Sequence, residues 1–239
     1  NHVSWNNGVK GSLVSLTAND LPAAATYRLR FASITPGTAT GPANTGVAEA
    51  FTYNRSLSDV EVQKVNTYLA LKYGQTLPHN YFGPGYDGTN ASTNTLYDIS
   101  TYGNRVFGVG RHIAGCFIQN QSNSVQAESM LKISVDGAIL VENSQNVTPW
   151  NEVDRAYVVM GDNAGALNWV TTNKPALYST NNCLNRIGRQ WKVTTTNLVP
   201  ALFVTIPDNS STAITKLDVV PVDNAVYMII NDNPDFSVN

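Results

Sequence analysis

The sequence predicts a mostly β chain built from antiparallel β-sandwich modules, with one short α-helix at about residues 58–73. Charged residues make up only 13% of the 239 residues, about half the share of roughly 25% that is usual for soluble domains. Short runs rich in β-branched and aromatic residues recur along the chain and are separated by Asn, Asp, Gly and Pro turns. Only one segment has the spacing of three and four residues that an amphipathic helix requires.

Three short strands are expected before the helix, at residues 13–16, 27–31 and 47–53. Within residues 27–31, aromatic and aliphatic side chains alternate with two arginines, which is the period-two pattern of a half-buried strand. A loop rich in Gly, Pro and Thr follows at residues 35–42, where tandem turn residues break any regular element.

The helix has start and stop signals at both ends. Ser58 is a candidate N-cap, and Glu61 three residues later completes a capping box. Gly74 supplies the C-terminal stop because glycine adopts a left-handed conformation without steric penalty. The helix is expected to pack on a sheet through an apolar stripe made of Val62, Val65, Leu69 and Tyr73.

After the helix, residues 77–98 are dense in Gly, Pro, Asn and Thr, and are expected to hold an inter-module region and a long loop. We therefore expect one module at residues 1–77 and a second β-sandwich at residues 78–239. The candidate strands of the second module are residues 106–109, 130–135, 156–160, 189–193, 201–206 and 225–230.

Two stretches resemble a known kind of bacterial surface protein. The sequence EAFTYNRSLSDVE at residues 49–61, continued by YLALKYG at residues 68–74, is similar to the end of a concanavalin-like or laminin-G-like jelly roll. Such jelly rolls occur in very large, Bacteroidetes-type cell-surface adhesin-like proteins. Residues 106–111, 119–122 and 186–193 resemble the β module that follows in those proteins.

The resemblance implies that residues 1–77 are the C-terminal part of a jelly roll, whose missing strands lie upstream or come from another chain. It also implies an extracellular, multidomain protein at the bacterial cell surface, associated with the outer membrane. The start at Asn1, without an initiator Met, leads us to expect a piece of a longer polypeptide. The Asn- and Thr-rich, charge-poor composition is typical of extracellular β proteins.

Composition argues against two classes of partner. The formal net charge is −2, and no run of Lys or Arg exists that would neutralise a series of phosphates, so nucleic acid is not expected as a partner. No stretch approaches the roughly 20 apolar residues of a membrane-spanning helix, so direct membrane insertion is not expected either.

Calcium is the best candidate for a bound ion, because hard oxygen ligands are abundant in the predicted loops. Asp223, Asp232 and Asp235 are the residues we predict to bind it, in a region where a solvated hairpin turn would have the same composition. Two weaker candidate sites are Asp87 with Asn90 and Asp162 with Asn163. The histidines stand in no metal-binding spacing.

The two cysteines, Cys116 and Cys183, form either one internal disulfide or two buried thiols. A nucleophilic pair of Cys116 with His112 is conceivable in a turn but has no sequence signature, and a structural Cys beside a surface His is the simpler interpretation. The glutamates are isolated from one another, so no glycosidase-like carboxylate pair is predicted.

Aromatic residues leave a carbohydrate site open. Trp191 lies in an alternating strand and is expected to point into the core, whereas Trp5, Trp150 and Trp169 lie in turn-rich surroundings and are candidates for ligand contact. We therefore expect a non-catalytic structural or adhesive module, with calcium-assisted carbohydrate binding as the alternative. Its expected partners are neighbouring modules of the same polypeptide, and surface glycans or other surface proteins.

Overall fold

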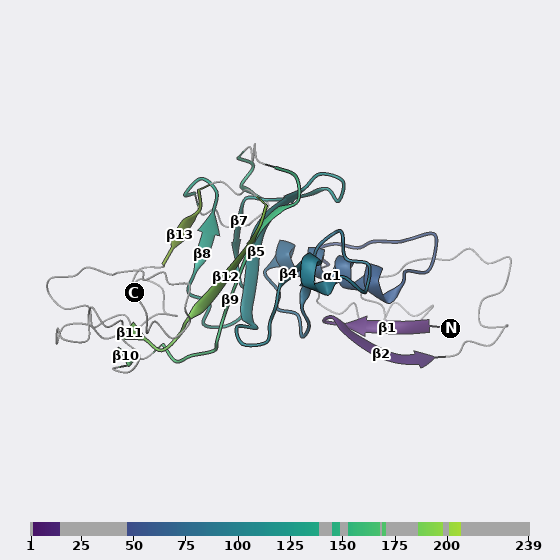
Figure 1. Cartoon of the computed structure of the whole chain (residues 1–239), viewed down its shortest axis with the longest axis horizontal. Coiled ribbons are helices and arrows are strands. Elements are labelled where there is room, and N and C mark those ends of the chain that lie inside the picture. Colours follow the sequence, from purple (N-terminus) through teal and green to yellow (C-terminus); the bar gives the residue numbers. More distant parts are fainter. Residues whose placement is uncertain are drawn as a thin grey trace, which may run out of the picture. The chain divides into compact units, whose positions relative to one another are not determined.

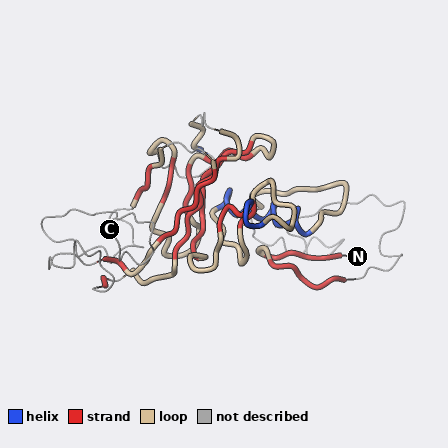
Figure 2. Tube along the Cα trace, viewed as in Figure 1, coloured by secondary structure: helices blue, strands red, loops and turns tan. Residues whose placement is uncertain are grey.

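A computed structural model describes residues 2–14, 47–138, 145–148, 153–167, 169–170, 186–197 and 201–206. Their contacts divide the chain into two units, Asn1–Asp59 and Val60–Asn239. The described strands pair antiparallel throughout, and the fold is mostly β, as Figure 2 shows. The predicted fold class is confirmed.

The N-terminal unit contains one described hairpin, β1 (His2–Asn6) paired with β2 (Val9–Val14). Asn7 and Gly8 connect the strands with φ angles of 47° and 80°, the left-handed pair that a tight two-residue hairpin turn requires. The strand expected at residues 47–53 is not formed, and the prediction of a strand there was wrong. That segment is irregular and its large side chains are about half exposed, whereas a strand of a jelly roll would bury one face.

The C-terminal unit is built on two antiparallel sheets (Figure 1). The larger sheet has the order β12-β9-β5-β6, and the smaller has the order β13-β8-β7. The strands of the larger sheet are β5 (Asn104–His112), β6 (Phe117–Gln119), β9 (Ala156–Asp162) and β12 (Trp191–Thr196). Those of the smaller sheet are β7 (Gln121–Asn123), β8 (Lys132–Ser134) and β13 (Phe203–Thr205).

The two sheets share one hydrophobic core. Phe107 and Val109 of β5, Val158 and Met160 of β9, and Ile133 of β8 are all buried in it. These residues recur at every second position, so they come from one face of each strand. Two sheets packed through such inner faces form a β-sandwich.

The opposite face of the larger sheet is buried as well. There Val106, Tyr157 and Val159 pack with Leu71 of α1 (Asp59–Tyr73) in a second core. The short strands β3 (Tyr81–Phe82) and β4 (Thr95–Tyr97) add Tyr81 and Tyr97 to this core. Every residue of β9 is consequently buried, as expected for a strand covered on both faces.

Helix α1 begins directly after Ser58 and ends at Tyr73, which confirms the predicted helix and its packing on a sheet. The predicted buried stripe was wrong, because its four residues are only partly buried, whereas Thr67, Ala70 and Leu71 are fully buried. Thr67 belongs to this face because its hydroxyl accepts a hydrogen bond from the Phe82 amide at 3.0 Å. The buried face of the helix therefore includes a polar residue, Thr67, whereas the sequence predicted an apolar stripe.

Gly74 ends the helix with a φ of +63°, as predicted from the sequence. Its position is also crowded, since a Cβ placed there would lie 2.1 Å from the backbone oxygen of Asn123. Glycine is therefore required both by backbone conformation and by the close approach of the β7 backbone.

Residues 78–98 were expected to join two modules, but they are part of the C-terminal unit. They form β3, the short helix α2 (Ala91–Asn94) and β4, and they bury Tyr81 and Tyr97 completely. Because α1 packs on the larger sheet, the contacts place the boundary between the units after Asp59, whereas the sequence suggested residue 77. The Gly and Pro residues of this segment separate short elements that are packed into the fold.

Most of the strands predicted for the second module are present. Those expected at 106–109, 130–135, 156–160, 189–193 and 201–206 correspond to β5, β8, β9, β12 and β13, and the one at 225–230 lies outside the described residues. Trp191 packs against the sandwich core, as predicted. A further pair, β10 (Trp169–Val170) with β11 (Arg186–Ile187), was not predicted as strands.

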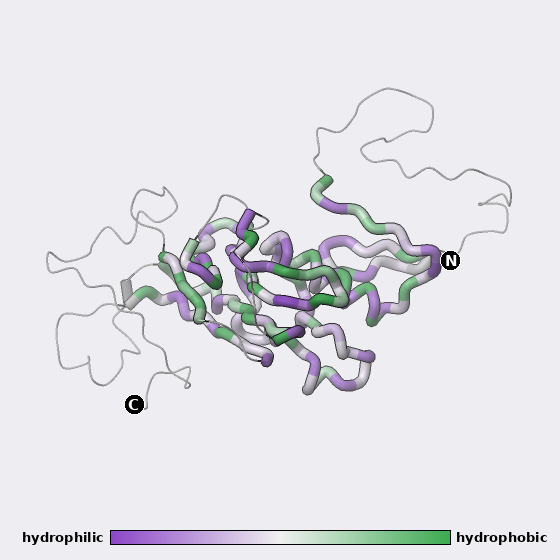
Figure 3. Tube along the Cα trace, turned by 90° about the horizontal axis from the view of Figure 1, so that it is seen from above, coloured by the Kyte–Doolittle hydropathy of each residue, from purple (hydrophilic) through white to green (hydrophobic). Residues whose placement is uncertain are grey.

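Hydrophobic residues occur in short stretches, which are green in Figure 3 and separated by hydrophilic ones. Among the described residues, no helix is both long and apolar enough to cross a membrane.

Candidate functional site

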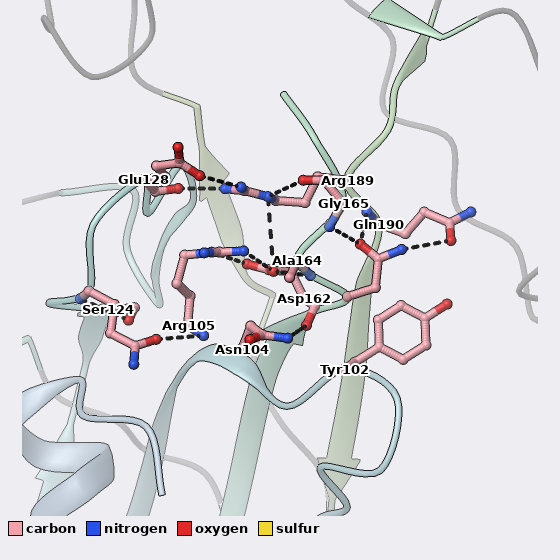
Figure 4. A network of polar contacts seen from close by, with 12 residues as sticks. Tyr102, Asn104, Arg105, Ser124, Glu128, Asp162, Ala164, Gly165, Arg189 and Gln190 are labelled. Carbon is pink, nitrogen blue, oxygen red and sulfur yellow. Dashed lines mark hydrogen bonds and ion pairs between the residues drawn. The ribbon is translucent and has the colours of Figure 1, made fainter. Parts of the chain in front are cut away.

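Charged side chains meet at one end of the larger sheet, as Figure 4 shows. Asp162 ends β9 and is paired in register with Asn104 at the start of β5 and with Trp191 at the start of β12. This register brings Arg105 and Arg189 to the same carboxylate, although both are distant from it in sequence. We call Arg105, Glu128, Asp162 and Arg189 the Asp162 network.

Asp162 is 1% exposed and its carboxylate is surrounded by donors. Arg105 donates from Nε to Oδ2 at 2.6 Å and from Nη2 to Oδ1, a bidentate arrangement. The Ala164 amide donates to Oδ1 at 2.8 Å, and Nε of Arg189 lies 3.9 Å from the same atom. The carboxylate charge is therefore balanced within the fold.

The guanidinium of Arg189 is buried and reaches the smaller sheet. Its Nε donates to the Gly165 backbone oxygen at 3.0 Å, and its Nη1 donates to the Glu128 backbone oxygen at 2.6 Å. Its Nη2 donates to Glu128 Oε2 at 2.8 Å, and the Glu128 side chain is 62% exposed. Because Glu128 lies between β7 and β8, this arginine ties one sheet of the sandwich to the other.

Three residues around this network have left-handed backbones although none is glycine. The φ angles are 46° for Arg105, 61° for Glu128 and 55° for Ala164. Such conformations cost about 1–3 kcal/mol each and persist where surrounding contacts hold them. Here the holding contacts are the hydrogen bonds of Asp162 and Arg189.

The contacts of the Asp162 network connect strand ends and loops of the two sheets, which is a structural role. Both oxygens of the Asp162 carboxylate accept hydrogen bonds from donors of the fold, and the two arginines lie on either side of it. Asn163, the other half of a weaker calcium candidate, accepts hydrogen bonds at its Oδ1 from the Gly165 and Gln190 amides. This pair of residues therefore stabilises a turn between strands.

A second polar cluster lies where the chain passes from β6 to β7. Asn120 donates from Nδ2 to the backbone oxygens of Asn146 at 2.9 Å and Thr148 at 2.7 Å. Asn146 donates from its own Nδ2 to Asp136 Oδ1 at 3.0 Å and to Gln121 Oε1 at 3.4 Å. We call Asn120, Gln121, Asp136, Asn146 and Thr148 the Asn146 cluster.

Asp136 is the one ionisable residue of this cluster. The Thr148 hydroxyl donates to its Oδ2, and the amides of Asn146 and Ala138 donate to its Oδ1. These hydrogen bonds, with that of Thr148 the strongest, lower the pKa of Asp136 below its usual value. The carboxylate is therefore charged at neutral pH.

The predicted calcium ligands Asp223, Asp232 and Asp235 lie outside the described residues, and so does Cys183. Calcium binding at the three aspartates and a disulfide between Cys116 and Cys183 stay predictions. Within the described ranges, no group of three or more His, Cys, Asp or Glu side chains is placed to hold a metal ion. Asp87 Oδ1 accepts hydrogen bonds from the Thr89 amide and hydroxyl, both at 2.9 Å, and from the Asn90 amide at 3.1 Å, so the weaker candidate there forms a turn.

Cys116 is exposed in the turn that joins β5 to β6. Burial lowers the pKa of His112, the last residue of β5, so its imidazole is neutral at pH 7, and the His112 ring lies against Gly115 of the turn. Of the tryptophans considered for ligand contact, Trp5 lies half-buried in β1 and Trp150 lies outside the described residues. Trp169 is placed in β10.

Sequence reasoning missed both clusters. The first left no local signal, because Arg105, Asp162 and Arg189 are far apart in sequence and only the register of the strands brings them together. The signal for the second was a run of polar residues with no turn-forming Gly or Pro, and in the structure Gln119, Asn120, Gln121, Ser122 and Ser124 are all buried.

Comparison with known proteins gives one match. The model of a family described as a domain of unknown function, DUF8202, matches residues 61–239, which is 179 of 239 residues. No curated protein and no solved structure matches the chain. The family match begins one residue after the start of the C-terminal unit, and the chain belongs to this family.

Proposed function

We propose that this member of the DUF8202 family is a non-catalytic structural or adhesive module of a secreted or surface-exposed bacterial protein. In this role the C-terminal unit serves as a stable β-sandwich that is carried between neighbouring modules of a long polypeptide. Its partners are those modules, together with surface glycans or other surface proteins.

The observation that carries this proposal is the use made of the buried charges. The chain has few charged residues. Three of them, Arg105, Asp162 and Arg189, connect neighbouring β-strands and the two sheets through ion pairs and hydrogen bonds. Active sites present their perturbed carboxylates and cations to a cleft, whereas these groups are saturated by one another. Such a tie favours a role in which cohesion of the fold matters.

The surface context is supported by composition and by the resemblance of residues 49–61 and 68–74 to bacterial adhesin-like proteins. A surface rich in Asn, Ser and Thr makes short-range hydrogen bonds without long-range charge attraction, which suits contact with uncharged glycans and with neighbouring modules.

Labelling of intact cells tests the proposal. Antibodies raised against the purified chain are applied to intact and to lysed cells of the source bacterium, and an in-frame deletion of residues 60–239 is compared with the parent in a surface-attachment assay. We expect labelling of intact cells and a reduced attached fraction in the deletion strain.

Labelling that requires lysis would contradict surface exposure, and unchanged attachment would contradict adhesion. A strain carrying Asp98→Asn is the matched control, because this carboxylate lies in an exposed turn outside the Asp162 network and the variant should attach like the parent.

A further inference from the structure

We propose that the inner face of β12 is a docking surface for residues 225–230 of the same chain, which add a fourth strand to the smaller sheet beside β13. The proposal concerns the completion of the sandwich, and it does not depend on the adhesive role.

The register of β12 with β9 shows which side chains of β12 face the other sheet. Val193 is paired with Met160, and Thr195 is paired with Val158. Side chains of directly opposed residues lie on the same face of a sheet, and Met160 and Val158 are both buried in the core between the two sheets. The inner face of β12 therefore consists of Trp191, Val193 and Thr195.

Two of these three positions are uncovered. Trp191 packs against the core, but Val193 is 52% exposed and Thr195 is exposed as well. The outer face of the same strand is covered, since the Lys192 ammonium lies 4.5 Å from the centre of the Tyr97 ring of β4. A valine on the core-facing side of a strand is expected to be buried, so the exposure of Val193 shows where the described part of the second layer stops short.

The widths of the two sheets explain this exposure. The chain passes directly from β6 to β7, so these outermost strands lie on the same side of the sandwich, and β12 and β13 are the outermost strands on the other side. Among the described residues the larger sheet has four strands and the smaller has three. Because strands in all sheets have nearly the same spacing, three strands that start at the common side reach only as far as β9, and β12 stays uncovered.

β13 has room for a further strand at its free edge. Val204 is paired with Ile133, which is buried in the core. Leu202 and Ile206 are two positions away on either side, so they lie on the same core-facing side as Val204. Leu202 packs against the core, whereas Ile206 is 38% exposed. β13 pairs with β8 along one edge and, within the described part of the chain, with no strand along the other.

Residues 225–230 have the sequence that such a strand requires. The run AVYMII is uncharged, and its β-branched, aromatic and aliphatic residues favour extended structure. It is six residues long, as is β12. Side chains alternate between the two faces of a strand, and both faces of this one would be apolar. One face would cover Val193, and the other would lie beside Phe203, which is 50% exposed on the outer side of β13.

The segment also belongs to the same unit as the two sheets. The family model matches residues 61–239, which include both β13 and residues 225–230, and the contacts assign the chain up to Asn239 to the C-terminal unit. The connection between β13 and this segment contains the 18 residues 207–224, which is enough to return to the free edge of β13. Pairing with β12 would extend the larger sheet and leave the inner face of β12 open, so the edge of β13 is the better position.

Photo-crosslinking in the full chain tests the proposal. The photoreactive amino acid p-benzoyl-phenylalanine is placed at Val193 and, in a control chain, at Ile118, which is 60% exposed on β6 at the opposite edge of the larger sheet. Isotope-labelled and unlabelled chains are mixed before irradiation, and crosslinked peptides are identified by mass spectrometry. We expect the probe at Val193 to crosslink to residues 225–230 of its own chain, and the probe at Ile118 to give no such product.

Three results would overturn the proposal. Crosslinks between labelled and unlabelled chains would show that a second copy covers β12. Crosslinks from Val193 to another part of the same chain would identify a different segment, and no crosslink at all would show that the inner face of β12 is open to solvent.

Hydrogen exchange of the unmodified chain gives a second measurement that needs no substitution. The amides of residues 225–230 should exchange at least about 100-fold more slowly than those of an unstructured peptide, because a strand beside β13 has its amides in hydrogen bonds. Exchange at the rate of an unstructured peptide would contradict the proposal, whatever the probe at Val193 shows.

Discussion

At the scale of single residues, Asp162 connects several parts of the fold. It receives hydrogen bonds from Arg105 and Ala164, and it lies in register with strands on both sides. Burying an ion pair is expensive, so the stability comes from keeping every member of the set in place. The left-handed backbone of Arg105 shows that geometry is maintained against local preference.

The roles of single residues were also the least predictable feature from the sequence. Gly74 was predicted as a helix stop because its left-handed conformation follows from its place at the end of the helix, although its close contact with Asn123 could not be foreseen. The pairing of Arg105 with Asp162 depends on the register of β5 with β9, which no local pattern encodes. For the same reason Asp162 was considered as an ion ligand and is in fact a partner of arginine.

Buried tyrosines lead to a prediction about alkaline pH. Burial raises the pKa of Tyr81, Tyr97 and Tyr157 above the usual value of 10. A pKa raised by folding gives stability that is complete below pH of about 10 and declines as the pH rises above it. In a titration followed at 295 nm, these three should ionise only as the chain unfolds.

The variant Tyr157→Phe should make the free energy of unfolding less dependent on pH above 10, because one of the three groups is removed. Reversible ionisation of all 11 tyrosines near pH 10, with the near-UV circular dichroism of the fold intact, would contradict this account.

At the scale of elements, hydrophobic periodicity predicted most of the strands of the two sheets and missed two short ones, β6 and β7, where the chain passes from one sheet to the other. β5, β9 and β12 were found from alternating or continuous apolar runs. β6 and β7 were missed because the chain between the two sheets is polar and is buried through distant partners, such as the bond from Gln119 to the Leu71 backbone oxygen at 3.4 Å. Polar burial of this kind is set by tertiary contacts and leaves no periodic signal.

The end of α1 leads to a second prediction. Gly74→Ala should lower the free energy of unfolding by about 2–4 kcal/mol, because alanine adds a left-handed strain and its Cβ would collide with the Asn123 backbone oxygen. Urea denaturation measures the change.

Gly137→Ala is the matched control for this prediction. Gly137 has a φ of +78°, but a Cβ there would come no closer than 3.4 Å to the Phe203 ring, so only the strain of about 1 kcal/mol is expected. Equal losses in the two variants would show that the close approach of β7 to the helix end contributes nothing.

At the scale of the whole molecule, the C-terminal unit has two cores, one on each face of the larger sheet. The mostly β class followed from composition and strand patterns, and it was predictable for that reason. The boundary between the two units did not follow from the sequence. A Gly- and Pro-rich segment suggests a linker, whereas in the structure this segment is anchored in the fold by the buried side chains of Tyr81 and Tyr97.

A fragment of residues 60–239 should therefore fold alone. Both cores are made of residues from this unit, so the fragment should melt in a single cooperative transition, within a few degrees of the corresponding transition of the full chain. Differential scanning calorimetry of the two proteins checks this. A fragment that melts without a cooperative transition would show that residues 1–59 complete its core.

The most direct test of the account is the free energy of unfolding of Asp162→Asn, measured by urea denaturation beside Asp98→Asn. Removing the buried carboxylate leaves two guanidiniums without their shared partner and should cost about 3–5 kcal/mol. Asp98 lies in an exposed turn outside the Asp162 network, so its loss should cost less than about 1 kcal/mol. Small and equal losses in the two variants would contradict the claim that the charged residues of this unit serve to hold its sheets together.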